Sequence, residues 1–451
     1  MAELAKMPKY STYINSGIDW IGNVPATWKI YTLKRTVDGC TNGLWGSDPK
    51  GNDEIIVLRV ADFNRNTLNV LDDKLTYRAI PVKERQGRLL KKGDLLIEKS
   101  GGGDKTLVGC VVRFDKDYEA VTSNFVAKMT PQKGFDSRFL KYVFSTIYDQ
   151  KITYKSIKQT TGIQNLDSAS YLNEKFPFPI LPEQITIANF LDLKSTQIDE
   201  AIAIKEKQIE LLKERKQIII QQAVTQGLNL NAPTKDSGVD WIGEIPEHWA
   251  YEPIKHSLKG IIDCEHKTAP FVDETDYFVV RTTNVKGGKL QMAGAKYTHE
   301  KGFKEWTRRG VPKVGDVLLT REAPAGEACL VPENINLCLG QRMVWLKINR
   351  ERLIPEFAIS LIYSSIGRTY IDFLSSGSTV LHFNMADINN IPVVLPPLKE
   401  QQELVEFIRN ESGKVDDGIE IQIQQIEKLK EYKTTLINSA VTGKIKVPGV
   451  V

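Results

Sequence analysis

The chain has 451 residues, more than a single compact core normally contains, and this length predicts two or three domains. Its composition, with 41% apolar and 26% charged residues, is typical of a globular protein. No apolar run approaches the roughly 20 residues that span a bilayer and the N-terminal segment lacks the apolar core of a signal peptide, which predicts a cytoplasmic protein without membrane contact. The net charge of +4 permits nucleic-acid binding, but only clusters of Lys and Arg would indicate it.

A thirteen-residue signature occurs twice in the chain. SGIDWIGNVPATW begins at Ser16 and SGVDWIGEIPEHW begins at Ser237, with the same residue at eight of the thirteen positions. Trp, Gly and Pro rarely match by chance, so the signature indicates an internal duplication. Each copy introduces one half of the chain.

Each signature is followed by a segment rich in predicted strands. IIVLRVADFN at 55–64 corresponds to YFVVRTTNVK at 277–286, which aligns Arg59 with Arg281. KKGDLLIEKSGGG at 91–103 corresponds to KVGDVLLTREAPAG at 313–326, where Gly-Asp precedes a β-rich run and a Gly-containing turn follows. Two similar β-rich globules are therefore expected.

A long helix is predicted at the end of each half. Residues 183–184 (Glu-Gln) match 400–401, and residues 223–225 (Ala-Val-Thr) match 440–442, both at an offset of 217. Apolar residues recur on each helix with the four-three spacing of a coiled coil, interrupted by polar residues that would restrict the register. The predicted seam contains Ile198, Ile202, Ile209, Leu212 and Ile219 in the first helix and Val415, Ile419, Ile426, Leu429 and Leu436 in the second. The alternative is that each helix packs separately on its own globule.

The order of the elements predicts an α+β protein. Two similar β-rich globules are separated by a pair of long antiparallel coiled-coil helices, with a pseudo-two-fold internal repeat. One compact globule connects the end of the first helix to the start of the second. The simplest way for such a connection to bring the two helices together is in antiparallel orientation. The predicted parts are residues 1–182, 183–228, 229–397 and 398–451. The first helix would be roughly 38 Å long over its 198–223 stripe, close to one turn of B-DNA at about 34–36 Å.

These features resemble the specificity subunit of a type I restriction-modification system. The resemblance rests on the paired DWIG-x-x-P-x-x-W signatures, on the Pro-rich runs FPILPEQ and LPPLKEQ that enter the helices, and on the Ala-Val-Thr near each helix end. It implies that residues 1–182 and 229–397 are target recognition domains, each reading one half of a bipartite duplex DNA target. It also implies two methyltransferase subunits and restriction subunits as partners, which would hold S-adenosylmethionine, ATP and Mg, so that this chain would need no cofactor. The signature tryptophans Trp20, Trp28, Trp241 and Trp249 are expected to pack against the helix ends rather than to stack on bases.

No catalytic motif is evident in the chain. It contains neither a GxxxxGK[ST] phosphate loop nor the Asn/Asp-Pro-Pro-Tyr/Phe run with which adenine methyltransferases hold a base. The triplet 214–216 with Asp199, repeated at 431–433 with Asp416, resembles a nuclease pattern, but its position along a helix favours an ordinary charged face. The five cysteines form no CxxC pair and have no neighbouring His at metal-ligand spacing, which predicts reduced, buried residues and no metal site.

Basic clusters precede the Gly-Asp strand in both halves, at 83–92 and at 301–313. Such clusters attract phosphates, whereas Arg and polar side chains on loops read base edges. Two short polar loops, TTGIQNL and GSTVLHFN, also suit entry into a groove. The candidate DNA contacts are Arg59, Lys91, Lys92, Lys99, Ser100, Lys105, Lys158, Thr160 and Gln164 in the first half, and Arg281, Arg308, Arg309, Arg321, Ser378, Thr379 and His382 in the second. For each one, packing on the protein or simple solvation is the alternative.

Two hypotheses of different class follow. The first is a non-catalytic subunit that recognises DNA, and the second is an assembly scaffold whose helices gather partner proteins without binding DNA. A methyltransferase with a degenerate motif is a more distant third. Duplex binding separates the first two, and binding of S-adenosylmethionine by this chain alone would support the third.

Overall fold

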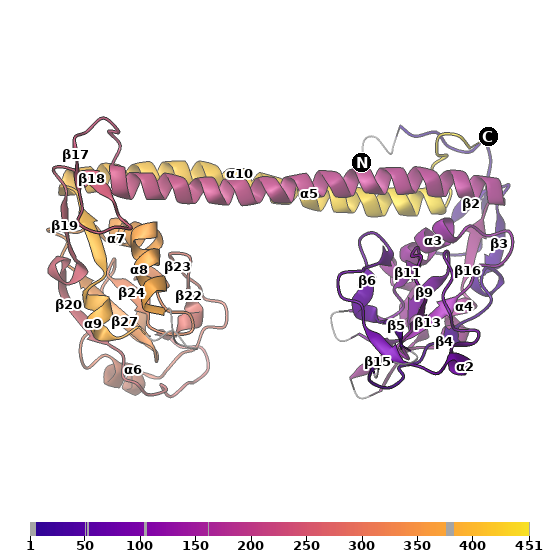
Figure 1. The fold of residues 1–451 in the computed structure, drawn as a ribbon, viewed down its shortest axis with the longest axis horizontal. Helices are drawn as coiled ribbons and strands as arrows, with labels where there is room; N and C mark the ends of the chain where they lie inside the picture. Colours follow the sequence, from indigo (N-terminus) through magenta and orange to yellow (C-terminus); the bar gives the residue numbers. More distant parts are fainter. Residues whose placement is uncertain are drawn as a thin grey trace. The chain divides into compact units, whose positions relative to one another are not determined.

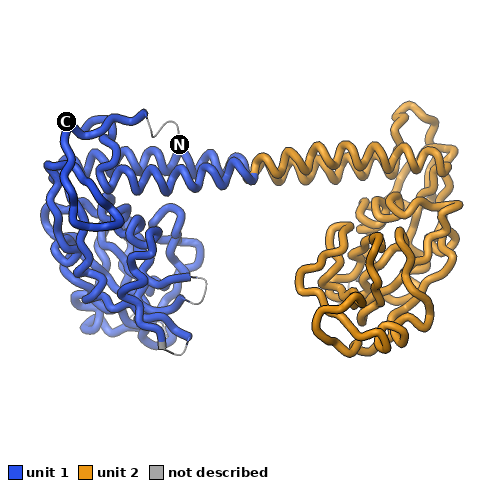
Figure 2. Tube along the Cα trace, turned by 180° about the vertical axis from the view of Figure 1, so that it is seen from behind, with its two compact units in different colours: residues 1–205, 423–451 blue, residues 206–422 orange. Residues whose placement is uncertain are grey.

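The computed structural model describes residues 6–49, 51, 54–102, 106–160, 162–375 and 383–450. The chain forms two compact units (Figure 2): unit 1 contains residues 1–205 and 423–451, and unit 2 contains residues 206–422. Both boundaries fall within long helices, α5 (Leu181–Gln226) and α10 (Leu398–Val441). Each unit therefore combines a β-rich globule with one portion of each long helix.

The portions of the two helices in unit 1 pair in antiparallel. Lys433 Nζ of α10 contacts both carboxylate oxygens of Asp199 of α5 at 2.7 Å. Farther along, Lys205 of α5 donates a hydrogen bond to Gln425 of α10. Residue numbers rise along one helix as they fall along the other, which defines the direction of the pairing.

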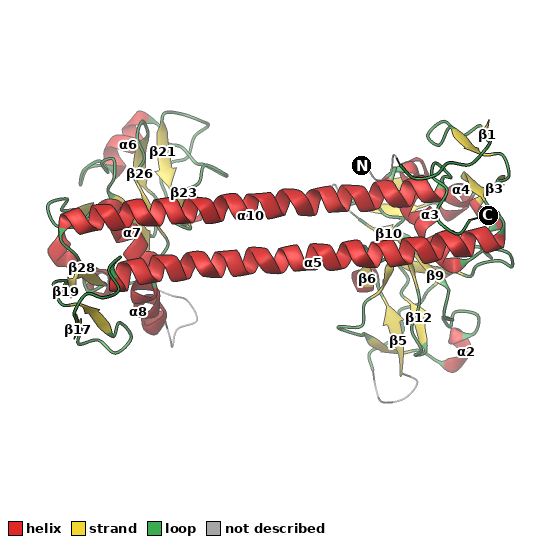
Figure 3. Cartoon of the chain, turned by 90° about the horizontal axis from the view of Figure 1, so that it is seen from above, coloured by secondary structure: helices red, strands yellow, loops and turns green. Residues whose placement is uncertain are grey.

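Unit 2 repeats the same arrangement with the equivalent residues of the other repeat. Lys216 Nζ of α5 contacts the two carboxylate oxygens of Asp416 of α10 at 2.8 and 2.7 Å. The Leu212 side chain lies against Gly418, where an added Cβ would be 3.7 Å from it. In each unit the two helix portions run side by side (Figure 3). These contacts between the helices are not those of helices that pack separately on their globules.

The predicted seam residues all lie at sheltered positions. Ile198, Ile202, Val415, Ile426 and Leu436 are buried, and Ile209, Leu212, Ile219, Ile419 and Leu429 are half-buried. Two of the polar interruptions, Lys216 and Lys433, make the ion pairs just described, because their long side chains reach Asp residues on the neighbouring helix. Residues of the supposed nuclease pattern thus bind each other across the helix pair.

The globule of unit 1 is built on a six-stranded mixed sheet with the order β4-β13-β9-β11-β7-β6. Its strands are β4 (Thr41–Asn42), β13 (Val126–Met129), β9 (Leu95–Glu98), β11 (Val111–Arg113), β7 (Asn69–Val70) and β6 (Phe63–Asn64). The smaller sheets are β12-β5-β8 (Ala120–Thr122, Glu54–Leu58, Tyr77–Ala79), β10-β15-β14 (Ser100–Gly101, Ile163–Leu166, Ile157–Thr160), β16-β3 (Lys175–Phe178, Lys29–Thr32) and β1-β2 (Tyr13–Asn15, Asn23–Pro25). Its helices are α2 (Val82–Arg85), α3 (Ser137–Asp149) and α4 (Ser168–Leu172).

Helix α3 attaches this globule to α5. The Tyr142 hydroxyl donates to Asp192 at 2.7 Å, and Lys141 Nζ lies 3.0 Å from the same carboxylate. Burial lowers the pKa of Lys141, against the opposing effect of Asp192. The apolar face of α3 covers the sheet, since Phe139, Leu140 and Phe144 are fully buried.

The globule of unit 2 has a four-stranded antiparallel sheet with the order β20-β27-β24-β25. Its strands are β20 (Leu258–Asp263), β27 (Met343–Ile348), β24 (Val317–Thr320) and β25 (Ala328–Leu330). The two-stranded sheets are β21-β26 (Tyr277–Val280, Asn336–Leu339), β22-β23 (Val285–Lys286, Lys289–Leu290), β19-β28 (Ala250–Pro253, Pro392–Leu395) and β17-β18 (Thr234–Asp236, Glu244–Pro246). Its helices are α6 (Glu300–Trp306), α7 (Pro355–Tyr363), α8 (Ser365–Ser375) and α9 (Met385–Asn389), and Figure 1 shows the order of the elements in both globules.

The second tryptophan of each signature lies where two helices meet a globule. Trp28 Nε1 donates to Glu183, in the first turn of α5, at 3.0 Å, and its ring lies against Gly443, just after α10. Trp249 is buried against Gly227, just after α5, in a core cluster that includes residues of α10. Each ring therefore joins the start of one long helix to the end of the other, which explains why the signature is repeated.

The first tryptophan of each signature is less constrained. Trp20 packs near Phe176, with ring centroids 6.1 Å apart, while Trp241 is exposed. The prediction that the tryptophans pack at helix ends is confirmed for Trp28 and Trp249 and is wrong for Trp241.

The expected α+β fold with an internal repeat and a pair of long helices is confirmed. The four predicted segments treat each long helix as a separate part, whereas the compact units divide both helices near their middle. None of the described helices combines the length and the apolar character needed to cross a membrane.

Candidate nucleic-acid interface

The aligned arginines Arg59 and Arg281 occupy the same structural position. Each immediately precedes a short 3-10 helix, and its backbone N–H donates to the third residue of that helix, Asp62 or Asn284. Arg59 also forms an ion pair with Asp62 at 2.9 Å, whereas the Arg281 guanidinium donates to the Gly294 carbonyl at 2.6 Å. Both side chains therefore have a structural role in the turn, and Arg59 additionally borders a cleft.

This cleft, hereafter the unit 1 cleft, has a volume of about 490 Å³ and lies in the globule of unit 1. Its walls include Trp45 and Phe125, which are 38% and 47% exposed. Its polar lining includes Ser100 and the buried Glu98. The cleft thus combines two accessible aromatic rings with hydrogen-bonding groups, a composition typical of binding sites.

Glu98, a buried residue of the lining of the unit 1 cleft, forms an ion pair with the partly exposed Arg65. Glu98 accepts a hydrogen bond from Arg65 at 2.7 Å, and the Arg65 guanidinium lies 5.7 Å from the centre of the Tyr148 ring. Burial raises the pKa of the Glu98 carboxyl above its usual range, against the opposing effect of Arg65. Since Gly101 lines the same cleft and lies beside Glu98 Oε1, that oxygen is on the cleft side of the carboxylate.

Several candidates lie in or next to the β10-β15-β14 sheet, and their polar groups already have partners within the protein. Lys99 Nζ donates to Asn42 at 2.6 Å, and Ser100 contacts Asn165 at 2.6 Å. Gln164 is buried and accepts from the backbone N–H of residue 108. Lys158 is exposed but pairs with Asp167 at 2.8 Å. Of these candidates, Arg59 and Ser100 line the unit 1 cleft, whereas Lys99 is the chain neighbour of Ser100 and Gln164 is buried.

The basic clusters lie on the surface. Lys91 and Lys92 are exposed, and Lys92 pairs with the exposed Asp117 at 3.0 Å. Arg308 and Arg309 are exposed near Glu265, at 3.7 and 3.8 Å. Ion pairs at this degree of exposure are weak, so these cations are available to phosphates.

Arg321 was named as a candidate DNA contact, but its side chain lies inside the protein. It is buried, its guanidinium contacts both oxygens of Asp263 at 2.9 and 2.8 Å, and its Nε donates to the Phe383 carbonyl at 2.9 Å. Burying a charged group costs free energy unless the group is paired and hydrogen-bonded, so a buried guanidinium is expected to have such partners. Arg321 therefore holds a loop in place and does not present its guanidinium on the surface.

Several candidates fall where the structure gives no description. Lys105, Ser378, Thr379 and His382 lie outside the described residues, as does the side chain of Thr160.

We predicted that no Cys has a neighbouring His at metal-ligand spacing, but the structure brings His266 close to Cys264. Its Sγ lies 4.0 Å from His266 Nδ1, and Asp263 completes a group whose ligand atoms all lie within 4.8 Å. His266 Nε2 is 3.0 Å from Asp263 Oδ2, and Asp263 also pairs with Arg321. Burial raises the pKa of the Cys264 thiol. Hydrogen bonds and an ion pair account for this grouping, and three ligands of which one is committed to Arg321 are a poor fit to a tetrahedral metal site.

Sequence reasoning missed the aromatic rings of the cleft. Trp45 and Phe125 each stand within short runs of Gly, Ser and Asn, in NGLWGS and SNF. An aromatic residue inside such a turn is the one sequence signal that would have singled them out, because turns seldom bury large rings.

Comparison with known proteins shows a family match in both repeats. The family model described as "Type I restriction modification DNA specificity domain" matches residues 41–214 and again 261–431. The chain is 25% identical over 433 residues to the putative type I restriction enzyme MjaX specificity subunit of Methanocaldococcus jannaschii, covering 95% of this chain and 96% of that protein. It is 25% identical over 337 residues to the type I restriction enzyme EcoKI specificity subunit of Escherichia coli, covering 72% and 68%.

Solved structures share the fold. A chain from a study of complex assembly and conformational transition of the type I R-M system has a TM-score of 0.67 at 14% identity, covering 93% of this chain and 98% of that one. The crystal structure of the HsdS subunit from Thermoanaerobacter tengcongensis has a TM-score of 0.52 at 15% identity, covering 94% and 98%.

Proposed function

Since this chain belongs to the family of type I restriction-modification DNA specificity proteins, we propose that it reads a bipartite duplex DNA target and assembles with methyltransferase and restriction subunits. It is a DNA-recognition subunit and not an enzyme, as its curated relatives are named specificity subunits. Each β-rich globule reads one half-site. The methyl donor, ATP and Mg bind to the partners, two of which are methyltransferase subunits.

The observation that carries this proposal is the internal repeat. Two globules share Arg59 and Arg281 at one structural position, and the family model matches each repeat separately. A duplicated reader whose copies differ in their surface side chains suits a target with two different halves. Exposed cations such as Lys91 and Arg308 supply attraction to phosphates that does not depend on sequence.

The helices offer a surface for partner subunits. On α5, the apolar residues Ile204, Leu211 and Ile218 are exposed and spaced seven residues apart, so they lie on one face outside the seam. Ile421 of α10, the repeat equivalent of Ile204, is exposed as well. Within the described residues this face is uncovered, and exposed apolar stripes of this kind mark protein interfaces. We assign it to helices of the methyltransferase subunits.

Methylome sequencing tests the proposal. The chain is co-expressed with a type I methyltransferase subunit in cells without other adenine methylation. The expected result is methylated adenine in a two-part motif with a constant gap, absent when this chain is omitted. A complex that assembles but neither binds duplex DNA nor directs methylation would instead establish the scaffold function.

A matched pair of variants tests the phosphate contacts. Lys91→Gln is expected to weaken duplex binding for all sequences and to lower the slope of log K against log salt by about one. Lys74→Gln, which also changes an exposed lysine of unit 1 outside the basic cluster, is expected to leave both quantities unchanged. Equal effects of the two substitutions would contradict the assignment.

A further inference from the structure

Backbone hydrogen bonds show which residues of the two globules are equivalent. The N–H of Lys99 donates to the carbonyl of Phe125 at 2.8 Å, and the N–H of Arg321 donates to the carbonyl of Arg342 at 2.8 Å. In unit 1 the bond joins the residue after β9 to the residue before β13, which is the neighbour of β9 in the sheet. In unit 2 it joins the residue after β24 to the residue before β27, which is the neighbour of β24. Phe125 of unit 1 and Arg342 of unit 2 therefore occupy the same position.

A second equivalence comes from the edge strands. Asn42 ends β4 and Asp263 ends β20, and these residues bind the equivalent cations: Lys99 contacts Asn42 at 2.6 Å, and Arg321 contacts Asp263 at 2.8 Å. Trp45 follows Asn42 by three residues and His266 follows Asp263 by three residues, so the two side chains stand at equivalent places in the loops after these strands.

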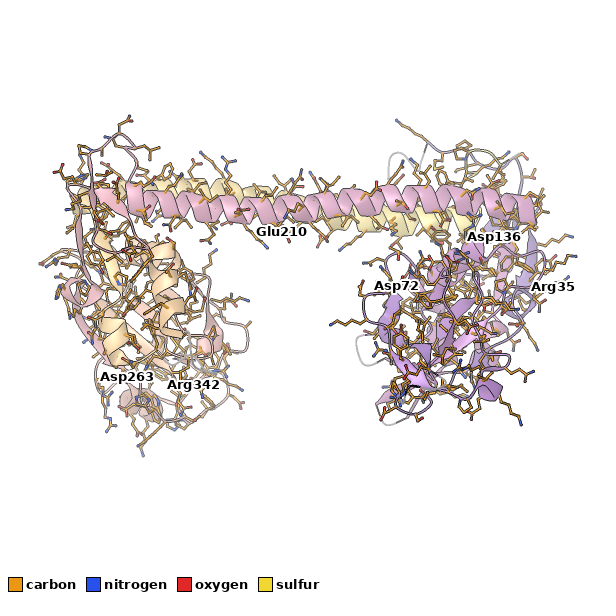
Figure 4. The ribbon with its side chains drawn as sticks, in the orientation of Figure 1. Arg35, Asp72, Asp136, Glu210, Asp263 and Arg342 are labelled. Carbon is orange, nitrogen blue, oxygen red and sulfur yellow. The ribbon has the colours of Figure 1, made fainter. Side chains whose placement is uncertain are left out.

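The framework is thus shared while the exposed side chains differ in chemistry. In unit 1, Trp45 and Phe125 flank the unit 1 cleft, and the Arg78 guanidinium lies 4.8 Å from the centre of the Trp45 ring and holds it in place. In unit 2, Arg342 is exposed at the surface and lies 3.0 Å from Glu322. Figure 4 shows Asp263 and Arg342 close together at the end of their globule far from the helices.

Two further features set Arg342 apart from a solvated arginine. Its backbone is left-handed, with φ of 68°, a conformation that costs free energy for a residue with a side chain and recurs at functional sites. It also directly precedes the buried strand β27, so a rigid element fixes its position. The backbone of Arg342 is therefore held firmly, while its side chain, which is 55% exposed, extends from that fixed point to the surface.

We propose that these equivalent positions determine which bases each globule reads. Phe125 and Trp45 form an apolar contact for the 5-methyl group of a thymine in the half-site of unit 1, and Arg342 donates to O6 and N7 of a guanine in the half-site of unit 2. The inference rests on the proposed function, and it adds the residues and the bases that they recognise. Phenylalanine against the thymine methyl and arginine against guanine are the pairings that the major groove favours.

Base analogues test the proposal on the unaltered protein. The complex with the methyltransferase subunit is titrated with duplexes carrying its methylome-defined motif. Replacing one thymine by deoxyuridine removes the methyl group and is expected to weaken binding about fourfold. Replacing one guanine of the other half-site by 7-deazaguanine removes the N7 acceptor and is expected to weaken binding about tenfold. If no thymine or no guanine shows such an effect, the corresponding assignment is wrong.

Protein variants locate the two contacts. Phe125→Ala should abolish the effect of deoxyuridine and leave that of 7-deazaguanine, while Arg342→Gln should do the reverse. The matched controls are Tyr154→Ala, another exposed aromatic residue of unit 1, and Arg352→Gln, another ion-paired surface arginine of unit 2. Both controls should retain both effects.

The outcomes separate this inference from the proposed function. If the unaltered protein directs no two-part methylation, the proposed function itself fails. If it does, but Phe125→Ala or Arg342→Gln keeps its analogue effect and its motif, the function stands and the assignment of these residues is overturned.

Discussion

Replacing Lys433 by methionine is expected to destabilise the protein more than the same change at Lys216. The two lysines are repeat equivalents, and each contacts both oxygens of one aspartate on the other long helix. Their surroundings differ, because Lys433 also donates to the Asn66 carbonyl at 2.8 Å. Lys433 thereby joins the helix pair to the globule of unit 1.

The expected magnitudes follow from burial. Side-chain exposure is 13% for Lys433 and 31% for Asp199, against 27% for Lys216 and 50% for Asp416. Hydrogen bonds to charged groups contribute about 1.5–3 kcal/mol when sheltered from water, so Lys433→Met should cost about 2–3 kcal/mol. The more exposed pair falls in the range of about 0.2–1 kcal/mol typical of surface ion pairs.

The assay is a double-mutant cycle in urea. Lys433→Met, Asp199→Asn and the double variant are unfolded in parallel with Lys216→Met, Asp416→Asn and their double variant, followed by far-UV circular dichroism. A coupling free energy above about 1 kcal/mol is expected for the first cycle, and a smaller one that falls further in high salt for the second. Equal costs in the two cycles would refute the argument that burial and the Asn66 contact set the difference.

Three further predictions concern partners and the two half-sites. Calorimetry should show no micromolar binding of S-adenosylmethionine to this chain alone, and such binding would overturn its assignment as a non-enzyme. Substituting Asp for both Ile209 and Ile426 places charges in the seam and should abolish partner assembly in gel filtration; an intact complex would mean that the seam is not needed. Inserting four residues after both Leu212 and Gly418 adds about 6 Å to the pair in step. In methylome sequencing the gap between half-sites should then grow by one or two base pairs, at about 3.4 Å each, with both half-sites unchanged; altered half-sites would contradict a mechanical role for the helices.

Much of the fold was predictable because its determinants are local or repeated. The seam spacing around Ile202 and Ile426 specifies an amphipathic helix within a few turns, irrespective of the rest of the chain. The repeated signature predicted two globules, because two stretches that share Trp, Gly and Pro at the same spacing rarely match by chance. Trp28 and Trp249 accordingly take equivalent places at the helix ends.

The candidate interface was less predictable, because its geometry depends on strands that are distant in the sequence. Arg321 was a candidate DNA contact, but its guanidinium is buried and pairs with Asp263, 58 residues earlier in the chain. Phe125 and Trp45 were not predicted as candidates, because only the arrangement of the strands brings them to one cleft. Neither burial nor pairing of this kind can be read from local periodicity.

The sequence by itself determined that the protein is duplicated, that each half ends in a long helix with an apolar seam, and that the family signature occurs twice. Periodicity is visible within a few turns of the chain, and the repetition is visible when the two halves of the sequence are compared. The tertiary structure decided which lysine pairs with which aspartate across the helices and which side chains occupy equivalent positions in the two globules, such as Phe125 and Arg342. These relations arise only when strands and helices that are far apart in the sequence pack together. Packing then determines which polar side chains are buried and must find hydrogen-bond partners within the protein, and which stay exposed on its surface.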